Sequence, residues 1–593
     1  MRQAWVTTAI LAVVFAQAAK AVNFEQCLNN INQLTIEGKT DNHGHPVSPS
    51  SSNATAITFD LCVSQCGAGQ EPFVWTVFSQ QFSAWLLPWL ALVSQLPFGS
   101  NDKLDNLNTM LLTLGSPTLA AYSLALTTLN GRWIASLFSD YRYPNVREAV
   151  QVLSSLQQSP LQVNTDEARL ASLIVLRQNR KFWRKLLEGL NYTHTWSISA
   201  AASILWVVIA YVFTIIDYFS QSAQATINTN GGSVGSLWLW LLPVVVGWLQ
   251  ISPKCDSTRL VKAVDDANAL SYIATSKSTP QRAGRKSEKH AFSLQFTKDN
   301  DLRKDERTTA PIHNYARSLP WVNSVMVVSG MFNNAFQRNR DHEPVTDTDW
   351  VNPNSRKRSQ ATAEQVENYC GSEPLPNSIT SKSLPPRPTG RWGLDDNAIS
   401  RMILASALAL MLQWGTTGGA VVIVWFTPTV GLGCRSASYI VYGSISTLVW
   451  MMLLASSILT YYFTDTADSP TIPHSTNAVR PIRPTNYRIA GLLSIFLRRC
   501  GKFLAALNAG WIVAMGIIQF SSVFDRCYCN SSVFGLRKNA YNVITLTPDD
   551  AGSMRGAWIC GFLLSGIPTL FYAGFIHLRV DPPLPTNHSN GET

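Results

Sequence analysis

Charged residues are scarce in this sequence. Asp, Glu, Lys and Arg together make up 14% of its 593 residues, whereas soluble globular domains carry about 25%. The shortage is uneven, because long stretches without any charge alternate with very polar segments. This pattern excludes a chain built only of water-soluble domains and predicts a membrane protein.

Sequence patterns of catalysis and nucleotide binding are also missing. The chain has no HExxH zinc motif, no GxGxxG loop after a strand and no Walker lysine loop. Asp41, His43 and His45 could ligate a transition metal, but without further ligands at metal-site spacing a solvent-exposed turn is favoured. We therefore expect no enzyme, no catalytic residue, no metal site and no cofactor.

The net charge of +10 comes from Lys and Arg in loops that flank apolar runs. This distribution is typical of the positive-inside bias of membrane proteins and less so of a nucleic-acid-binding surface. The expected partner is the lipid bilayer, and no nucleic acid is predicted. The oligomeric state is left open.

Apolar runs predict seven transmembrane helices, because backbone polar groups in lipid must be satisfied within the protein. Two of the runs, 402–426 and 439–463, have 25 residues each and no charge. At about 1.5 Å per residue each reaches roughly 37 Å, enough to cross a hydrocarbon core of about 30 Å. The predicted spans are 82–98, 196–219, 235–251, 402–426, 439–463, 503–524 and 554–577. The fold class is therefore all-α, a polytopic helical membrane protein.

Two apolar segments leave the number of spans open. Run 82–98 contains Pro88 and Pro97, and a helix lying in the membrane interface would reverse every later orientation. Segment 109–129 has no charge, but seven Ser and Thr residues and the Gly-Ser-Pro sequence at 115–117 interrupt its apolar character. We interpret it as a membrane-proximal or partly buried element, and an additional span is the alternative.

Residues 1–21 have the pattern of a secretory signal peptide, with Arg2, an apolar run and small residues before Ala18 and Ala21. A short signal anchor is the alternative, and both place segment 22–81 outside the cytosol. Seven spans then make 525–553 extracellular. They make 99–195, 252–401, 464–502 and the tail 578–593 cytosolic. The predicted location is a multi-pass protein of the secretory pathway and the plasma membrane.

Six of the ten cysteines fall on the predicted outer side. They are Cys27, Cys62, Cys66, Cys434, Cys527 and Cys529. An even number in an oxidising compartment is compatible with disulfides, although fifteen pairings are open and Cys434 is a candidate partner for each of the others. N-glycosylation is predicted at Asn53 and Asn530, whereas the Asn587 sequon falls in the cytosolic tail.

The long segment 252–401 is rich in Lys, Arg, Ser, Thr and Pro and is predicted to be largely disordered. Its basic clusters at 281–286 and 355–359 could attract anionic lipid or a cytosolic protein. The apolar island at 318–336 is too short to span a membrane and would suit a segment that docks on membrane or protein.

The sequence QWGTTGG at 413–419 lies in the middle of a predicted span. Gly-rich interruptions at mid-depth can unwind a helix and form a ligand or ion site, with tight helix packing as the alternative. The candidate ligand or transport residues are Gln413, Thr416, Thr417, Gly418 and Gly419. Two rows of small residues, at 506–514 and 557–565, indicate helix packing, and Asn508 and Gln519 could hydrogen-bond across helices.

Several motifs resemble a group of uncharacterised multi-pass membrane proteins of filamentous fungi. They are CVSQCG at 62–67, WLLP at 85–88, QLPF at 95–98, LGSP at 114–117, LNGRW at 129–133 and WFTPTVGLGCRS at 425–436. The resemblance covers the membrane portion and fades in the long loop, and it implies a secretory-pathway membrane architecture without an assigned activity. We therefore expect a non-enzymatic sensor or scaffold. The alternative is a transporter or channel with its site at the centre of span 402–426.

Overall fold

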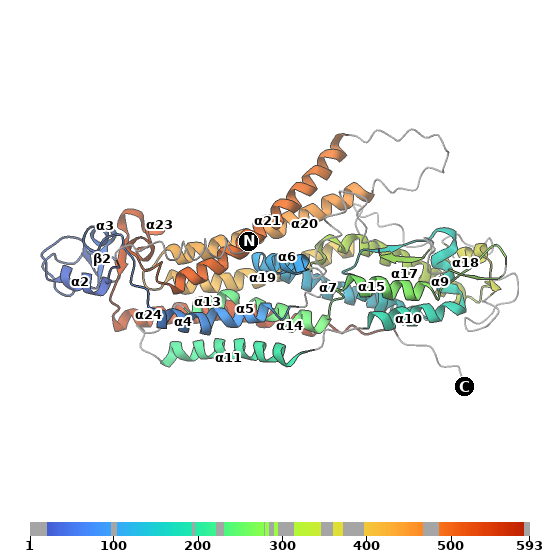
Figure 1. Ribbon diagram of the computed structural model, residues 1–593, viewed down its shortest axis with the longest axis horizontal. Helices are drawn as coiled ribbons and strands as arrows, with labels where there is room; N and C mark the ends of the chain where they lie inside the picture. Colours follow the sequence, from blue (N-terminus) through green and yellow to red (C-terminus); the bar gives the residue numbers. More distant parts are fainter. Residues whose placement is uncertain are drawn as a thin grey trace.

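The computed structural model describes residues 21–96, 103–191, 196–220, 231–277, 279–283, 290–294, 313–345, 360–371, 396–465 and 485–585. The chain is mainly helical, and its described strands have two or three residues each. Three parts follow one another along the long axis (Figure 1): a disulfide head, a central bundle and a distal domain. Each part has a hydrophobic core of its own.

Among the described residues, five helices of the central bundle are long and apolar enough to cross a membrane. They are Ser233–Ile251, Asn397–Trp425, Cys434–Tyr461, Ile489–Phe520 and Met554–His577. These runs lie in α13 (Gly231–Trp238) with α14 (Leu241–Ile251), α19 (Asp396–Trp425), α20 (Cys434–Asp465), α21 (Thr485–Phe520) and α24 (Pro548–His577). They confirm a helical chain with membrane-length apolar helices, and five of the seven predicted spans coincide with them.

The other two predicted spans form helices that do not meet the same test. Span 82–98 belongs to a helix made of α4 (Trp75–Gln81), the π-helical turn η2 (Phe82–Leu86) and α5 (Leu87–Val93). Span 196–219 is α11 (Ile198–Ser220), which runs alongside the bundle in Figure 1. The stretch of α11 whose side chains are described without a gap, Ile198–Phe213, is apolar.

Segment 109–129 lies deeper than we expected. It falls in α6 (Lys103–Gly115) and α7 (Pro117–Leu137), two helices bent by 105° that would count as a sixth span if taken together. Residues 117–128 are all buried. Their polarity does not oppose burial, because Thr127 and Thr128 donate hydrogen bonds of 2.8 and 3.0 Å to carbonyls four residues back. The segment is therefore part of the bundle interior.

The predicted cytosolic loop 464–502 is shorter in the structure, because α21 already begins at Thr485. The two arginines at 498–499 do not end the helix. Arg498 is fully buried, and its Nη2 donates to Thr460 Oγ1 at 2.7 Å on α20. A charge that finds hydroxyl acceptors on a neighbouring helix can stay inside a helix pair, so the helix continues past this position.

The prediction that 252–401 is largely disordered is wrong where the structure describes it. Its helices α15 (Ser257–Asn268), α17 (Ser318–Arg340) and α18 (Ala363–Cys370) pack with α8 (Val146–Ser155), α9 (Arg169–Val175) and α10 (Arg180–Leu190). Two antiparallel pairs join them: β3 (Leu161–Val163) with β6 (Phe292–Leu294), and β4 (Tyr272–Ile273) with β5 (Gln281–Arg282). The apolar island is α17, and it docks on protein. A composition rich in Lys, Arg, Ser, Thr and Pro predicts disorder because such a segment alone cannot bury enough apolar surface, and segment 137–190 supplies the other half of the core.

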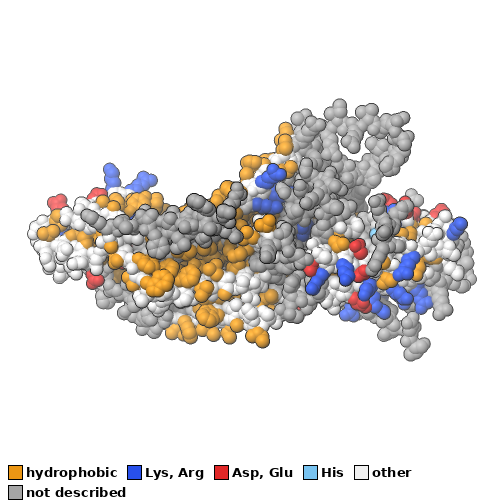
Figure 2. Space-filling model, in the orientation of Figure 1, with side chains coloured by type: hydrophobic (Ala, Val, Ile, Leu, Met, Phe, Trp, Pro, Cys, Tyr) orange, Lys and Arg blue, Asp and Glu red, His pale blue; other side chains and the backbone are white. Residues whose placement is uncertain are grey.

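The disulfide head joins two segments that are far apart in the sequence. Strand β2 (Ala56–Thr58) lies between β1 (Lys39–Thr40) and β7 (Tyr541–Val543), antiparallel to both. α2 (Phe24–Asn32) and the π-helical turn η1 (Cys62–Cys66) complete it. In Figure 2, hydrophobic side chains gather over the central bundle, and charged side chains gather mostly toward the two ends.

Candidate functional site

The six cysteines of the predicted outer side form three pairs. Cys27 pairs with Cys66, Cys62 with Cys527 and Cys434 with Cys529, at Cα–Cα distances of 5.7, 5.9 and 4.9 Å. These distances are usual for disulfides. The Cys62–Cys527 pair joins residues 465 positions apart, and the Cys434–Cys529 pair attaches the first residue of α20 to the head. Cys255, Cys370, Cys500 and Cys560 are not disulfide-bonded.

The predicted glycosylation sites differ in exposure. Asn53 is exposed, whereas Asn530 is partly buried and its Oδ1 accepts a bond of 3.4 Å from Arg435 Nη1. Arg435 also forms an ion pair with Asp525 at 2.5 Å. Glycosylation at both positions stays a prediction. Asn587 and residues 1–20 of the predicted signal peptide lie outside the described residues.

Asp41, His43 and His45 form a turn. The Asp41 carboxylate accepts bonds from the backbone N–H groups of His43 and His45 at 2.9 and 2.8 Å. Burial acts to raise the pKa of Asp41, but these hydrogen bonds outweigh it, so the pKa is lowered. Within the described part of the chain, no group of three or more His, Cys, Asp or Glu side chains could hold a metal ion.

The Gly-rich centre of span 402–426 does not unwind. α19 is continuous, and Thr416 Oγ1 donates to the Leu412 carbonyl at 2.9 Å as in a regular helix. A Cβ on Gly419 would clash with the Gly561 carbonyl oxygen of α24, and one on Gly415 would lie 2.7 Å from Pro568 Cγ. The structure therefore supports the packing alternative for these glycines, which let α19 and α24 approach closely.

The interrupted backbone lies instead at the α6–α7 bend. The Gly115 carbonyl accepts a bond of 2.8 Å from Asn508 Nδ2 on α21, and the Leu114 carbonyl accepts one of 2.8 Å from Tyr442 OH on α20. A Cβ at Gly115 would overlap the Ala505 carbonyl. Ser116 caps α7 by accepting from the Leu119 N–H at 3.2 Å. Broken backbone at membrane depth needs such partners inside the protein.

Gln413 and Thr417 lie beside this bend. Gln413 Nε2 donates to Thr417 Oγ1 at 2.5 Å, and Gln413 Oε1 accepts from Ser446 Oγ at 3.4 Å. Ser446 in turn contacts Thr118 at 3.1 Å and accepts at its carbonyl from Ser116 at 2.8 Å. We call Ser116, Thr118, Gln413, Thr417, Tyr442, Ser446 and Asn508 the polar cluster. It is uncharged, and it joins four helices of the bundle.

Three of the seven residues of the polar cluster can be predicted from the sequence. Gln413 and Thr417 are candidates from the sequence, and Asn508 is expected to hydrogen-bond across helices, as it does. The same expectation holds for Gln519, whose Oε1 accepts from Tyr439 OH at 2.6 Å. The Gly-Ser-Pro sequence at 115–117 is the available signal for Ser116 and Thr118. By hydropathy alone this sequence predicts only an interruption of the apolar segment.

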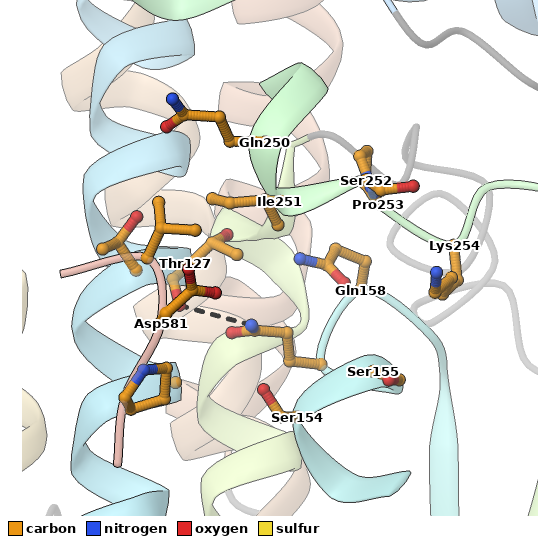
Figure 3. Close-up of a pocket in the computed structure, with 15 residues that line it drawn as sticks. Thr127, Ser154, Ser155, Gln158, Gln250, Ile251, Ser252, Pro253, Lys254 and Asp581 are labelled. Atoms are coloured by element: carbon orange, nitrogen blue, oxygen red, sulfur yellow. Dashed lines mark hydrogen bonds between the residues drawn. The ribbon is translucent and has the colours of Figure 1, made fainter. Parts of the chain in front are cut away.

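A second candidate is a cavity of about 180 Å³ where the bundle meets the distal domain (Figure 3). Its walls come from α7, α8, the end of α14 with the residues after it, and the segment after α24. The lining includes Thr127, Thr128, Gly131, Ser154, Ser155, Gln157, Gln158, Gln250, Ile251, Ser252, Pro253, Lys254, Val580, Asp581 and Pro582. No local motif marks it, because four separate segments contribute.

No known protein family, curated protein or solved structure matches the chain. Functional inference therefore rests on the geometry of the molecule.

Proposed function

We propose that this chain is a multi-pass membrane protein that acts as a sensor or scaffold, without enzymatic activity, by coupling the disulfide head to the distal domain. The head would face the outside and the distal domain the cytosol. Supporting this, the apolar surface of the central bundle in Figure 2 separates two polar ends, as expected for a protein that crosses a bilayer.

The order of the chain supports seven crossings. Residues 22–72, 427–433 and 521–547 belong to the head end, and 137–191 and the described residues of 252–371 to the distal end (Figure 1). The connections between them are the series from α4 to α7, then α11, α13 with α14, α19, α20, α21 and α24. In this topology the first crossing is a chain of broken helices, so segment 109–129 adds no eighth span.

The observation that carries the coupling proposal is the course of α20. Its first residue, Cys434, pairs with Cys529 of the head. Its 32 residues reach roughly 48 Å. Near its other end, Ser457 Oγ donates to the Tyr315 carbonyl at 2.7 Å, and Tyr461 OH accepts from Asn323 Nδ2 at 3.2 Å. One rigid helix thus touches both ends of the molecule.

The test compares two disulfide variants in the full-length protein. Replacing Cys434 and Cys529 by Ser removes the covalent link between α20 and the head and leaves the Arg435–Asp525 ion pair, whereas replacing Cys27 and Cys66 removes a disulfide within the head. We expect amide hydrogen exchange in 313–325 to speed up about five-fold or more in the first variant only, which corresponds to a coupling free energy of about 1 kcal/mol. Equal exchange in wild type and both variants would contradict coupling through α20.

Transport is the second candidate, and the α6–α7 bend supports it. Helices broken at mid-depth beside polar side chains occur at the substrate sites of transporters. The candidate site then moves from the glycines of α19 to the polar cluster. The variant Gly419→Leu cannot distinguish transport from a sensor or scaffold role, because a larger side chain at this position would disrupt the close contact between α19 and Gly561 of α24 in either case.

A sharper test of transport is Ser446→Ala, with Thr447→Ala as the matched control. Thr447 contacts Trp414 on the same helix pair, at 3.1 Å, outside the polar cluster. Transport predicts uptake of at least one small polar solute by proteoliposomes, altered by the first substitution and not by the second. Absence of uptake by the wild type across a solute panel would leave the sensor or scaffold role.

Three further expectations stay proposals: membership of the fungal group, residence in the plasma membrane, and contact of segment 252–401 with anionic lipid or a cytosolic protein. Glycosidase treatment tests the orientation. Loss of a glycan from Asn53 or Asn530 supports a head outside the cytosol. A glycan acquired at a sequon engineered near residue 350 would contradict it.

A further inference from the structure

The cavity of Figure 3 lies where the bundle and the distal domain meet, at the cytosolic boundary of the proposed topology. Two glutamines that line it each carry a buried polar atom without a hydrogen-bond partner among the described residues: Gln157 Oε1 and Gln158 Nε2. Their residues are 4% and 2% exposed. Buried polar groups are normally paired, so these two atoms indicate a place for a molecule that hydrogen-bonds.

The two glutamines are held in place by bonds that leave these atoms available. Gln157 Nε2 donates to the Thr127 carbonyl at 3.3 Å, the dashed line in Figure 3. The backbone carbonyl of Gln158 accepts from Arg317 Nη1. In Figure 3 the Gln158 side chain reaches toward Ile251 and Thr127 on the opposite wall. The side-chain amide is therefore directed into the cavity while its backbone is fixed from behind.

The hydroxyls of the lining favour a ligand that donates several hydrogen bonds. Thr127 and Thr128 line the cavity and use their own protons on the carbonyls of Ser123 and Leu124, so their hydroxyl oxygens can act only as acceptors. Gln157 Oε1 is a further acceptor, and Gln158 Nε2 is a donor. A ligand with several O–H groups and oxygen acceptors matches this set.

Charge and size narrow the ligand class further. The lining has one cation, Lys254, and one anion, Asp581, which is exposed at the edge of the cavity. Opposite charges in equal number favour neither an anionic nor a cationic ligand. A volume of about 180 Å³ corresponds to about six water molecules at liquid density, enough for one molecule of roughly sugar size.

We propose that this cavity binds a small uncharged polyhydroxyl group, either a free polyol or the inositol-type headgroup of a lipid. Both sources share the same recognition chemistry, and the cavity lies where a headgroup of the inner leaflet would be. This inference does not depend on the sensor or transport proposal, because it concerns binding alone.

The test uses full-length protein in detergent and equilibrium dialysis with tritiated myo-inositol, sorbitol and glucose. We expect saturable binding of at least one of them, with one site per chain. Gln157→Leu and Gln158→Leu should each weaken it about tenfold or more, the effect of losing roughly one hydrogen bond. Gln337→Leu on α17 is the matched control, because its amide contacts Asn333 at 3.3 Å away from the cavity, and it should bind as wild type does.

Misfolding is separable from loss of binding. Gln158→Leu replaces a buried amide whose Nε2 has no partner among the described residues by an apolar side chain, so its thermal unfolding temperature without ligand should equal or exceed that of wild type. Gln158→Met gives a second variant of similar length. No saturable binding of any of the three polyols, or equal binding by wild type and the Gln157→Leu/Gln158→Leu double variant, would overturn the proposal and leave a site for ordered water only.

Two further measurements identify the source of the ligand. If nanodiscs containing phosphatidylinositol displace the bound polyol and phosphatidylcholine nanodiscs do not, the site takes a lipid headgroup. If neither kind of nanodisc displaces it, the site takes the free polyol. Both results support the polyhydroxyl site and assign its source.

Discussion

The disulfide head and the distal domain are stabilised in different ways. The head's main core cluster consists of Phe24, Leu28, Ile31, Ile57 and Leu61 with two disulfide cysteines. The distal core is much larger and contains Trp183, Trp321 and Phe332. All three disulfides of the described residues hold the head or attach it to α20. A small core is stabilised by covalent links, and a large one does not need them.

The two ends also bury charge differently. In the head, Lys39 is 1% exposed and its Nζ donates to the carbonyls of Leu34, Pro49 and Ser51 at 2.7, 3.1 and 2.7 Å. Near the distal domain, Arg401 Nε donates to Asn130 Oδ1 at 2.9 Å, and its guanidinium lies 4.0 Å from the Trp133 ring centre. The head thus uses a cation to fold a loop on itself, whereas the distal end uses one to join two helices.

The largest expected effect comes from the distal core. Trp183 is fully buried and donates to the Leu173 carbonyl at 3.1 Å. Trp183→Ala should lower the free energy of unfolding by about 3–5 kcal/mol, measured by hydrogen exchange in α10 and α17. Lys185→Ala on the same helix is the control and should change little. Equal loss of protection in the head would show that the two parts unfold together.

Removing the Cys62–Cys527 disulfide should destabilise the disulfide head and leave the distal core unchanged. The variant with Ser at positions 62 and 527 should destabilise the head by about 2–5 kcal/mol, because β2 and β7 would be held by backbone bonds and small contacts alone. The measurement is hydrogen exchange of 22–72, with Cys560→Ser as the control. Comparable loosening of the distal core would contradict the separation of the two parts.

Acid should weaken the boundary between the bundle and the distal domain. Burial lowers the pKa of His313 to about 4 from an ordinary 6.5, opposed by a hydrogen bond to the Thr109 backbone and reinforced by the charge of Lys502. As the pH falls from 6.5 to 4, the unfolded chain takes up a proton that the folded chain resists. Stability should therefore drop by about 3 kcal/mol across this window.

His313→Phe should flatten this pH dependence, as followed by thermal unfolding between pH 4 and 7. His342→Phe, at an exposed position after α17, is the control and should keep the wild-type slope. If the pH dependence of stability persists in His313→Phe, titratable groups other than His313 cause it.

The smallest effect is expected from the buried cation of the head. Lys39→Met should cost about 2 kcal/mol, because three carbonyls lose a charged donor. Faster reduction of the Cys27–Cys66 disulfide by dithiothreitol is the measurement. Lys538→Met changes an exposed lysine of the same head and should leave the reduction rate unchanged. An unchanged rate in Lys39→Met would show that the disulfides alone hold this loop.

Parts of the site could be read from the sequence because their signals are local. The uncharged run around Gln413 predicted a helix, and the helix is there. The recurring small residues near Gly561 predicted close packing, and α19 packs on them. In contrast, the sequence predicts only a membrane-proximal or partly buried element around Gly115, because its hydroxyls count as polar in hydropathy although Thr127 and Thr128 bond to their own helix.

The sequence by itself determined which segments become long apolar helices, since that preference depends on the residues of each segment and on lipid as the solvent. It also placed six cysteines on one side. Tertiary structure alone decided that Cys62 meets Cys527, that α6 and α7 enter the bundle, and that α15, α17 and α18 pack onto 137–190. Each of these depends on contacts between residues far apart in the chain, which no local composition encodes.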